Sequence, residues 1–243
     1  MILRSADVRS AIRNRQRGFI IDPFKFAAAG PPQPTFSNVE LLLHMDDSDG
    51  STTFTDSSSN ARTVTPVGAS QIDTAQSKFG GSSGLLDGSG DYLSVSTANS
   101  LNIRTQAFCL EGWMRFVTQP GTSTFISAGA SGTDLYVTWF TGTLYFGDGS
   151  SNPIVVASAP NSGIWHHIAC TFDTTTYRVF INGTEIGSTT SLLLNKTVSA
   201  WQIGGLTGNG WYHDGWMDDV RITFNEAVYT ADFTPPTSPH PDS

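Results

Sequence analysis

The sequence has few charged residues and almost no cysteine. Charged residues make up 14% of its 243 positions, and only Cys109 and Cys170 are cysteines. Long helical proteins are usually rich in Ala, Glu, Lys and Leu, so this composition argues against them. Two cysteines exclude a disulfide scaffold. Both lie in apolar, strand-like runs, where adjacent strands would let them pair, but two buried free thiols are the interpretation that we favour.

Long hydrophobic runs are also absent. No apolar stretch approaches the roughly 18 residues that span a bilayer, so we expect no membrane partner. The chain starts with Met1-Ile2-Leu3-Arg4 and then turns strongly polar. It therefore lacks the apolar segment of a secretory signal, and we expect no export by that route.

The few basic residues are unevenly distributed. Residues 1–30 hold six basic and two acidic residues, and the remaining 213 hold seven basic and 19 acidic residues. The first part is therefore net +4 and the rest net −12, which predicts a basic arm and an acidic body with different tasks. An acidic body would repel phosphates, so we expect no nucleic-acid binding by it.

Residues 1–36 form the predicted arm, whose last part, Gly30-Pro31-Pro32-Gln33-Pro34, is typical of an extended linker. The arm combines basic and large apolar side chains, and exposing the apolar ones to water would gain nothing. Burying each could contribute on the order of 1.5–3 kcal/mol. We therefore expect the arm to dock on a partner or on its own body. The predicted contact residues are Arg4, Arg9, Arg13, Arg15, Arg17, Phe19, Ile20, Ile21, Phe24 and Phe26.

The body reads as a dozen or so short strands separated by turns rich in Gly, Asn, Asp and Ser, without a long helix. The clearest hairpin has Asn182-Gly183 at its turn, between 177–181 and 184–187. Such spacing predicts an all-β fold of two antiparallel sheets packed face to face. We expect one sandwich over 37–236 and a Pro-rich tail over 237–243.

Five blocks of the body, 86–93, 108–116, 165–173, 179–183 and 217–222, occur in the order of a known family. Together they resemble the laminin-G-like, concanavalin-A-like jelly roll. The resemblance covers about 37–236 and implies a jelly-roll sandwich. Relatives in this family include carbohydrate-binding modules and glucanases.

A narrower resemblance lies at residues 221–223 and 227–239, which are similar to the C-terminal signature of versions in bacteriophage structural proteins. Phe224-Asn225-Glu226 departs from the turn that is more usual there. The resemblance implies a virion protein, either a capsid decoration or cement protein or a tail or fibre component, assembled in the host cytoplasm. Its partners would then be capsid or tail proteins. Because particle proteins are commonly symmetric, we also expect a homo-oligomer.

Catalysis is not expected. A retaining glycosidase needs two carboxyl groups about 5–5.5 Å apart, and residues i and i+2 of a strand share a face. No Glu in the sequence has Glu or Asp two residues away in a strand-like run, and the adjacent Asp218 and Asp219 would point to opposite faces. The side chains of His166 and His167 would likewise point to opposite faces and so could not bind the same metal ion. We predict a non-enzymatic protein with no catalytic residues, and a glycan-processing enzyme is the remote alternative.

Two weaker sites remain open. Calcium, which takes 6–8 oxygen ligands, is the one cofactor that we consider, at the acidic turns with Asp46, Asp47, Asp49, Asp87 and Asp91. These turns equally suit a solvated loop and a structural hairpin.

The second is a glycan site in the Gly-flexible loop 208–216, where flat aromatic rings stand beside polar groups. Its candidate residues are Trp211, Tyr212, His213, Asp214 and Trp216. The alternative is that the tryptophans plug the end of the core. A cell-surface glycan is therefore the other partner that we consider, with an adhesion lectin as the alternative function.

Overall fold

The computed structural model describes residues 31–103, 106–129, 134–149, 151–157, 160–191, 194 and 196–243. The chain divides into two units, Met1–Gly30 and Pro31–Ser243. The predicted arm residues, from Arg4 to Phe26, lie outside the described part.

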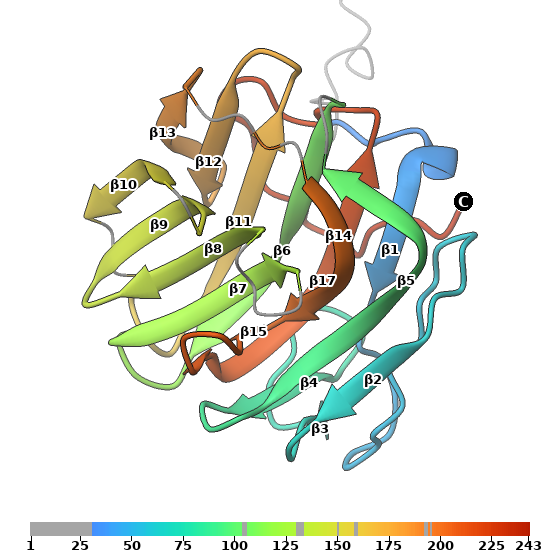
Figure 1. Cartoon of the computed structure of the whole chain (residues 1–243). Helices are drawn as coiled ribbons and strands as arrows, with labels where there is room; N and C mark the ends of the chain where they lie inside the picture. Colours follow the sequence, from blue (N-terminus) through green and yellow to red (C-terminus); the bar gives the residue numbers. More distant parts are fainter. Residues whose placement is uncertain are drawn as a thin grey trace, which may run out of the picture. The chain divides into compact units, whose positions relative to one another are not determined.

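Two antiparallel sheets lie face to face in the described part of the chain (Figure 1). The first has eight strands in the order β13-β12-β11-β6-β17-β4-β3, and β1 also pairs with β17. Its strands are β1 (Val39–Leu43), β3 (Gln71–Asp73), β4 (Ser83–Asp87), β6 (Phe108–Phe116), β11 (Trp165–Phe172), β12 (Tyr177–Ile181), β13 (Thr184–Thr189) and β17 (Asp214–Phe224). A short 3-10 helix, η1 (Phe36–Asn38), precedes β1.

The second sheet has seven strands in the order β10-β9-β8-β7-β14-β5-β2. Its strands are β2 (Val64–Val67), β5 (Tyr92–Ile103), β7 (Thr122–Ala128), β8 (Leu135–Phe140), β9 (Thr143–Asp148), β10 (Ser151–Ala157) and β14 (Lys196–Ile203). A two-stranded hairpin, β15 (Gly205–Leu206) and β16 (Trp211–Tyr212), follows β14. The all-β sandwich that the sequence predicts is confirmed.

Strand β6 shows how the sequence builds the core. Alternate residues Phe108, Leu110, Met114 and Phe116 belong to the cluster between the sheets, as the period of two along a strand requires. The residues between them point to the outer face of the eight-stranded sheet. Glu111 is among these, and it is nevertheless fully buried.

A β-bulge in β17 corrects one expectation from the sequence. The register between β17 and β6 shifts between Asp218 and Arg221, and Asp219 has φ +49°. Met217 and Val220 both point into the core, so one extra residue lies between them. The two aspartates therefore lie on the outer face together, where we had expected opposite faces, because a bulge interrupts the alternation.

The C-terminal segment covers part of this outer face. We call residues 225–243 the C-terminal strap; they include the seven residues predicted as a Pro-rich tail. Tyr229 packs in a second apolar cluster with Cys109, Ala169 and Phe180, and its ring stacks on Phe233 at 3.5 Å. The strap explains why polar residues on this face are buried.

The strap also crosses the predicted Asn182-Gly183 turn, which joins β12 to β13 as expected. Both residues have positive φ, +51° and +78°. The Phe233 N–H donates to the Gly183 carbonyl at 2.9 Å. A Cβ on Gly183 would lie 1.9 Å from the Phe233 oxygen, so glycine serves both the turn and the close approach of the strap.

Candidate functional site

A pocket of about 320 Å³ opens at one end of the sandwich. Three chain segments form it: the β4–β5 turn, the β6–β7 connection and the start of β17 with the neighbouring β16. The lining residues are Asp87, Gly88, Phe116, Thr118, Pro120, Gly121, Thr122, Ser123, Tyr212 and Asp214. Its volume lies at the lower end of the usual range for small-ligand sites.

The base of the pocket is held by a buried histidine. His213 Nδ1 lies 2.9 Å from Ser123 Oγ, Nε2 lies 3.2 Å from the Trp216 carbonyl oxygen, and the ring meets Phe116 edge to face at 5.2 Å. Burial lowers the pKa of His213 to about 4, so it is neutral at physiological pH. It positions Phe116 and Ser123, which line the pocket.

Two carboxylates share one wall. Asp87 and Asp214 are direct partners across β4 and β17. Burial and the Asp87 charge raise the pKa of Asp214. Gly88 follows Asp87 and has φ +77°, and a Cβ on it would lie 2.9 Å from Asp214 Cβ. Glycine at this position therefore allows the β4–β5 turn to lie close to Asp214. When ionised, the two carboxylates offer only hydrogen-bond acceptors.

Two aromatic residues of β16 stand beside the carboxylates. Tyr212 is half-buried, lines the pocket and stacks on Tyr92 with ring centroids 6.3 Å apart. Trp211, its neighbour, is half-buried and stacks on Phe140 at 4.9 Å. The arrangement joins aromatic surface to carboxylate acceptors, a combination that suits ligands with both apolar faces and hydroxyl groups.

The structure brings together only part of the predicted glycan site. Tyr212 and Asp214 line the pocket, and Trp211 lies next to Tyr212. His213 is fully buried beneath them. Trp216 is half-buried, does not line the pocket, and donates from Nε1 to Asp73 Oδ1 at 3.2 Å. The predicted loop is also partly strand, since β16 and the start of β17 fall within it.

The predicted calcium ligands cap turns. Asp91 accepts from the backbone N–H groups of Ala69 and Asp87, at 2.6 and 3.0 Å. Asp47 accepts from the Ser48 N–H and Ser51 hydroxyl, and Asp49 from Thr74. Asp46 lies against Gly80. Within the described ranges, no three His, Cys, Asp or Glu side chains are grouped so as to hold a metal ion.

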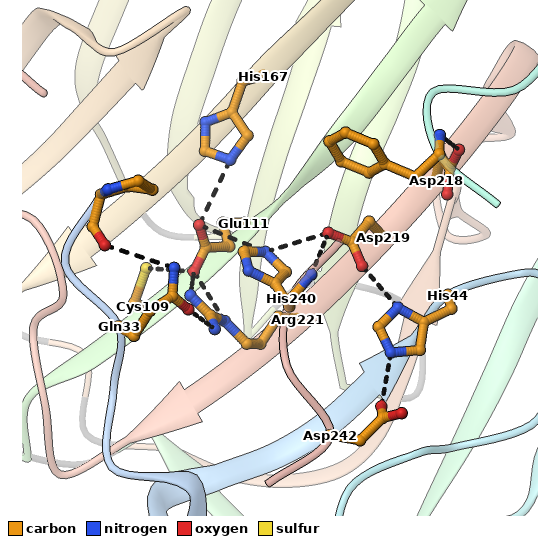
Figure 2. A network of polar contacts seen from close by, with 12 residues as sticks. Gln33, His44, Cys109, Glu111, His167, Asp218, Asp219, Arg221, His240 and Asp242 are labelled. Carbon is orange, nitrogen blue, oxygen red and sulfur yellow. Dashed lines mark hydrogen bonds and ion pairs between the residues drawn. The ribbon is translucent and has the colours of Figure 1, made fainter. Parts of the chain in front are cut away.

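A second polar cluster lies under the C-terminal strap (Figure 2). At its centre Glu111 Oε1 accepts from Arg221 Nε and Nη2, at 2.9 and 2.6 Å. Glu111 Oε2 accepts from the Tyr229 hydroxyl at 2.8 Å and lies 3.3 Å from His167 Nε2. Figure 2 shows His240 between Glu111 and Asp219, with Nε2 3.7 and 3.6 Å from their carboxylates.

The charges of this cluster are matched within it. The nearby Arg221 guanidinium, with His240 and His167, offsets burial and holds the pKa of Glu111 well below its usual range. Burial lowers the pKa of His240 to about 4. The hydrogen bonds and ion pairs of Glu111 join the sheet to the strap, so this cluster fastens the strap to the sheet.

At the edge of the cluster His44 sits between two carboxylates, with Nδ1 2.7 Å from Asp219 and Nε2 2.8 Å from Asp242. Asp219 and then Asp242 raise the pKa of His44 to about 9, against the opposing effect of burial. His44 is therefore charged at neutral pH. Its ion pair with Asp242 holds the C-terminal end of the chain next to β1.

Sequence reasoning missed the roles of Glu111, Arg221 and His240. An acidic residue inside the apolar run 108–116 was a usable signal, because a charge in a strand that is otherwise apolar needs a partner. It did not identify that partner, which lies 110 residues away. His166 and His167 do diverge, as predicted: His166 contacts Phe116 of the core, and His167 contacts Glu111 on the outer face.

No helix in the part of the chain that the structure describes has the length and apolar character to cross a bilayer. None of the curated proteins compared with the chain matches it. A family model described as the concanavalin A-like lectin/glucanases superfamily matches residues 87–229, more than half of the chain. The chain belongs to this superfamily. The jelly-roll resemblance read from the sequence is thereby confirmed.

Solved structures with the same fold include two binding domains. The chain is 16% identical to the binding domain of Paraclostridial Mosquitocidal Protein 1, with a TM-score of 0.59, covering 80% of this chain and 50% of that one. The receptor binding domain of the botulinum neurotoxin C/D mosaic serotype gives 15% identity and a TM-score of 0.60, with 80% and 49% covered. The chain thus spans about half the length of these binding domains.

A third similar structure is close to this chain in size. Domain 4 of AbnA, a GH43 extracellular arabinanase from Geobacillus stearothermophilus in complex with arabinotriose, is 18% identical with a TM-score of 0.58. The alignment covers 79% of this chain and 94% of that one. At these identities the comparisons show the fold.

Proposed function

We propose that this chain is a non-enzymatic binding protein whose jelly roll recognises a glycan in the pocket at the end of the sandwich. The observation that carries the proposal is the pocket itself, where Tyr212 stands beside Asp87 and Asp214. A sugar ring has apolar C–H faces that stack on an aromatic ring and hydroxyl groups that donate to carboxylates. Charge-assisted hydrogen bonds of this kind are about twice as strong as neutral ones.

The similar structures support this choice of ligand class. One of them holds arabinotriose, another is a botulinum neurotoxin binding domain in complex with SialylT, and a third concerns a neurotoxin interaction with two ganglioside molecules. Our proposal transfers only the ligand class to this chain, because the pocket residues supply the chemistry independently.

The test is a glycan array with the full chain, Tyr212→Ala and Tyr212→Phe. Losing the ring in Tyr212→Ala should abolish binding, whereas Tyr212→Phe should keep stacking and most of the signal. Val155→Ala, which alters an exposed apolar residue of β10, is the matched control. Binding that survives Tyr212→Ala would overturn the proposed site.

The non-enzymatic part of the proposal has its own test. Asp87 and Asp214 are the carboxylates that the fold pairs at the pocket, so they are the pair that any hydrolysis there would use. We expect incubation of every bound glycan with the chain to release no reducing ends. Turnover that is lost in Asp87→Asn or Asp214→Asn would contradict us.

A second function concerns the arm: we propose that it anchors the jelly roll to a bacteriophage virion, as a capsid decoration or tail component. The sequence supports this through the basic and apolar composition of residues 1–30 and the C-terminal signature. Gln33 accepts from Arg221 at 2.9 Å and Thr35 donates to Glu226 at 3.0 Å. A deletion should therefore end at residue 30.

Deleting residues 1–30 should leave glycan binding and thermal stability unchanged while removing the protein from purified particles. Five changes of Arg to Gln, at Arg4, Arg9, Arg13, Arg15 and Arg17, should weaken incorporation in the same direction. Normal incorporation of the deletion variant into particles would show that the arm does not anchor the protein.

A further inference from the structure

An aromatic platform lies beside the pocket. Phe140, at the end of β8, stacks on Trp211 of β16 with ring centroids 4.9 Å apart and planes inclined by 17°. Phe140 is 38% exposed, and Trp211 is half-buried. Stacked rings that remain partly open to solvent offer flat apolar surface to a ligand.

The platform and the pocket are continuous. Phe140 is the direct strand partner of Thr122, which lines the pocket. The next residue, Thr141, donates its N–H to the carbonyl of Gly121, another lining residue. On the other side Trp211 precedes Tyr212 in β16. Two separate chain connections thus tie the platform to the rim of the pocket.

The pocket is acidic. Asp87 and Asp214 are its charged lining residues, and among the described residues that line it none is basic. Residues 31–243 together are net −12. Charged clefts attract ligands of opposite sign and repel those of the same sign. A carboxylated sugar such as a sialic acid would bring a third negative charge against Asp87 and Asp214.

We infer that pocket and platform together bind a neutral oligosaccharide of two or more sugar units and discriminate against acidic glycans. One unit donates hydroxyl hydrogens to Asp87 and Asp214, and the next unit stacks on Phe140 and Trp211. The inference rests on the proposed glycan function and gives it a ligand class. It separates this chain from binding domains that take sialylated ligands.

The platform predicts a dependence on chain length. If the sugar-ring contact contributes as much as an aromatic pair, about 0.5–1.5 kcal/mol, adding the second unit should raise the affinity roughly 2- to 13-fold. Phe140→Ala should remove most of that gain while leaving the affinity for a single unit within about twofold. Asp214→Asn should weaken both ligands, because the pocket carboxylate acts on the first unit.

The experiment uses the full chain on an array that carries neutral glycans and their sialylated counterparts, followed by titration with a neutral length series. We expect neutral glycans to bind and their sialylated counterparts to bind at least about tenfold more weakly. Val155→Ala is the control for Phe140→Ala, since Val155 is 52% exposed and lies two strands away through Tyr145 and Thr138.

The outcomes separate the two proposals. Equal or stronger binding of sialylated glycans overturns the ligand class and leaves glycan binding intact. A Phe140→Ala effect no larger than that of Val155→Ala overturns the platform. Failure of the wild-type chain to bind any glycan overturns the proposed function, and the inference with it.

Discussion

Glu111 and Arg221 form a fully buried ion pair on the neighbouring strands β6 and β17, with Arg221 Nη2 2.6 Å from Glu111 Oε1. They are direct partners across the two strands. The C-terminal strap covers the pair, and Tyr229 adds its hydroxyl to the second carboxylate oxygen. The last part of the chain is thereby held to the middle of the eight-stranded sheet.

Breaking this pair should cost much stability. In Glu111→Gln the Arg221 charge stays buried without its counter-charge, and such changes typically cost about 3–5 kcal/mol. We expect a loss of that size in the free energy of unfolding, measured with denaturant at pH 7. Arg221→Met should cost a similar amount.

Arg178→Met provides the matched control. Arg178 of β12 pairs with Asp173 at 2.6 Å and with Glu185 at 3.5 Å, and these side chains keep 16–30% of their surface exposed, whereas Glu111 and Arg221 keep 0% and 1%. Exposed pairs contribute about 0–1 kcal/mol, so the control should lose no more than that. Equal losses at the two sites would contradict the role assigned to Glu111.

Stability should fall on the alkaline side because of His44. Its pKa is about 9 in the folded chain and about 6.5 in the unfolded chain. Because the pKa of His44 is higher in the folded chain, protonated His44 contributes its full stabilisation below pH 6.5. This stabilisation is lost as the pH rises through about 9. In unfolding experiments from pH 7 to about pH 10, His44→Gln should remove a decline on the order of 2 kcal/mol. A wild type and variant with parallel profiles would refute this.

On the acid side His213 should act in the opposite direction. The pKa of His213 in the folded chain is about 4. Below about pH 6.5 His213 is therefore protonated in the unfolded chain but still neutral in the folded chain. Stability present above pH 6.5 is lost as pH falls toward 4. His213→Asn should flatten this loss. Comparing the two proteins at each pH cancels the contribution of Asp218, whose pKa burial raises to about 7.

The two cysteines should be inert in the native protein. Cys109 and Cys170 are free, fully buried and on opposite faces of the eight-stranded sheet. Burial raises the pKa of both thiols, and the thiolate is the reactive form. A thiol reagent should modify neither cysteine before unfolding and both afterwards. Rapid labelling of the folded chain would contradict the packing.

Glycan binding should weaken at low pH. Asp214 accepts hydrogen bonds from sugar hydroxyls most strongly when it is ionised, and its pKa is raised by burial and by the Asp87 charge. Affinity should therefore drop as the pH falls into the acidic range and Asp214 takes up a proton. Asp214→Asn should bind more weakly at neutral pH and vary less with pH. A wild-type affinity that is constant over this range would count against the carboxylates as ligands.

The alternation of apolar residues predicts the sandwich because local pattern and sheet geometry agree. In β6, Phe108, Leu110 and Met114 form the core as the period of two requires, and Asn182-Gly183 forms the expected turn. The bulge at Asp218 and Asp219 is different, since nothing local distinguishes it from regular strand. It arises from pairing with a distant strand, which the sequence does not display.

The candidate site is only partly predictable for the same reason. Tyr212 and Asp214 stand out in the sequence as neighbouring aromatic and acidic residues. Asp87 joins them across β4 and β17, and Phe140 reaches Trp211 from β8. These contacts between distant segments decide which residues meet. They also place His213 beneath the pocket, although it stands between two lining residues in the sequence.

Glycan recognition by this pocket is tested most directly by the binding of the full chain to a glycan array, with Tyr212→Ala measured beside it. We expect the wild type to bind neutral oligosaccharides and Tyr212→Ala to bind none, with the same thermal stability for both proteins. No binding by a folded wild-type chain, or equal binding by both proteins, would contradict it.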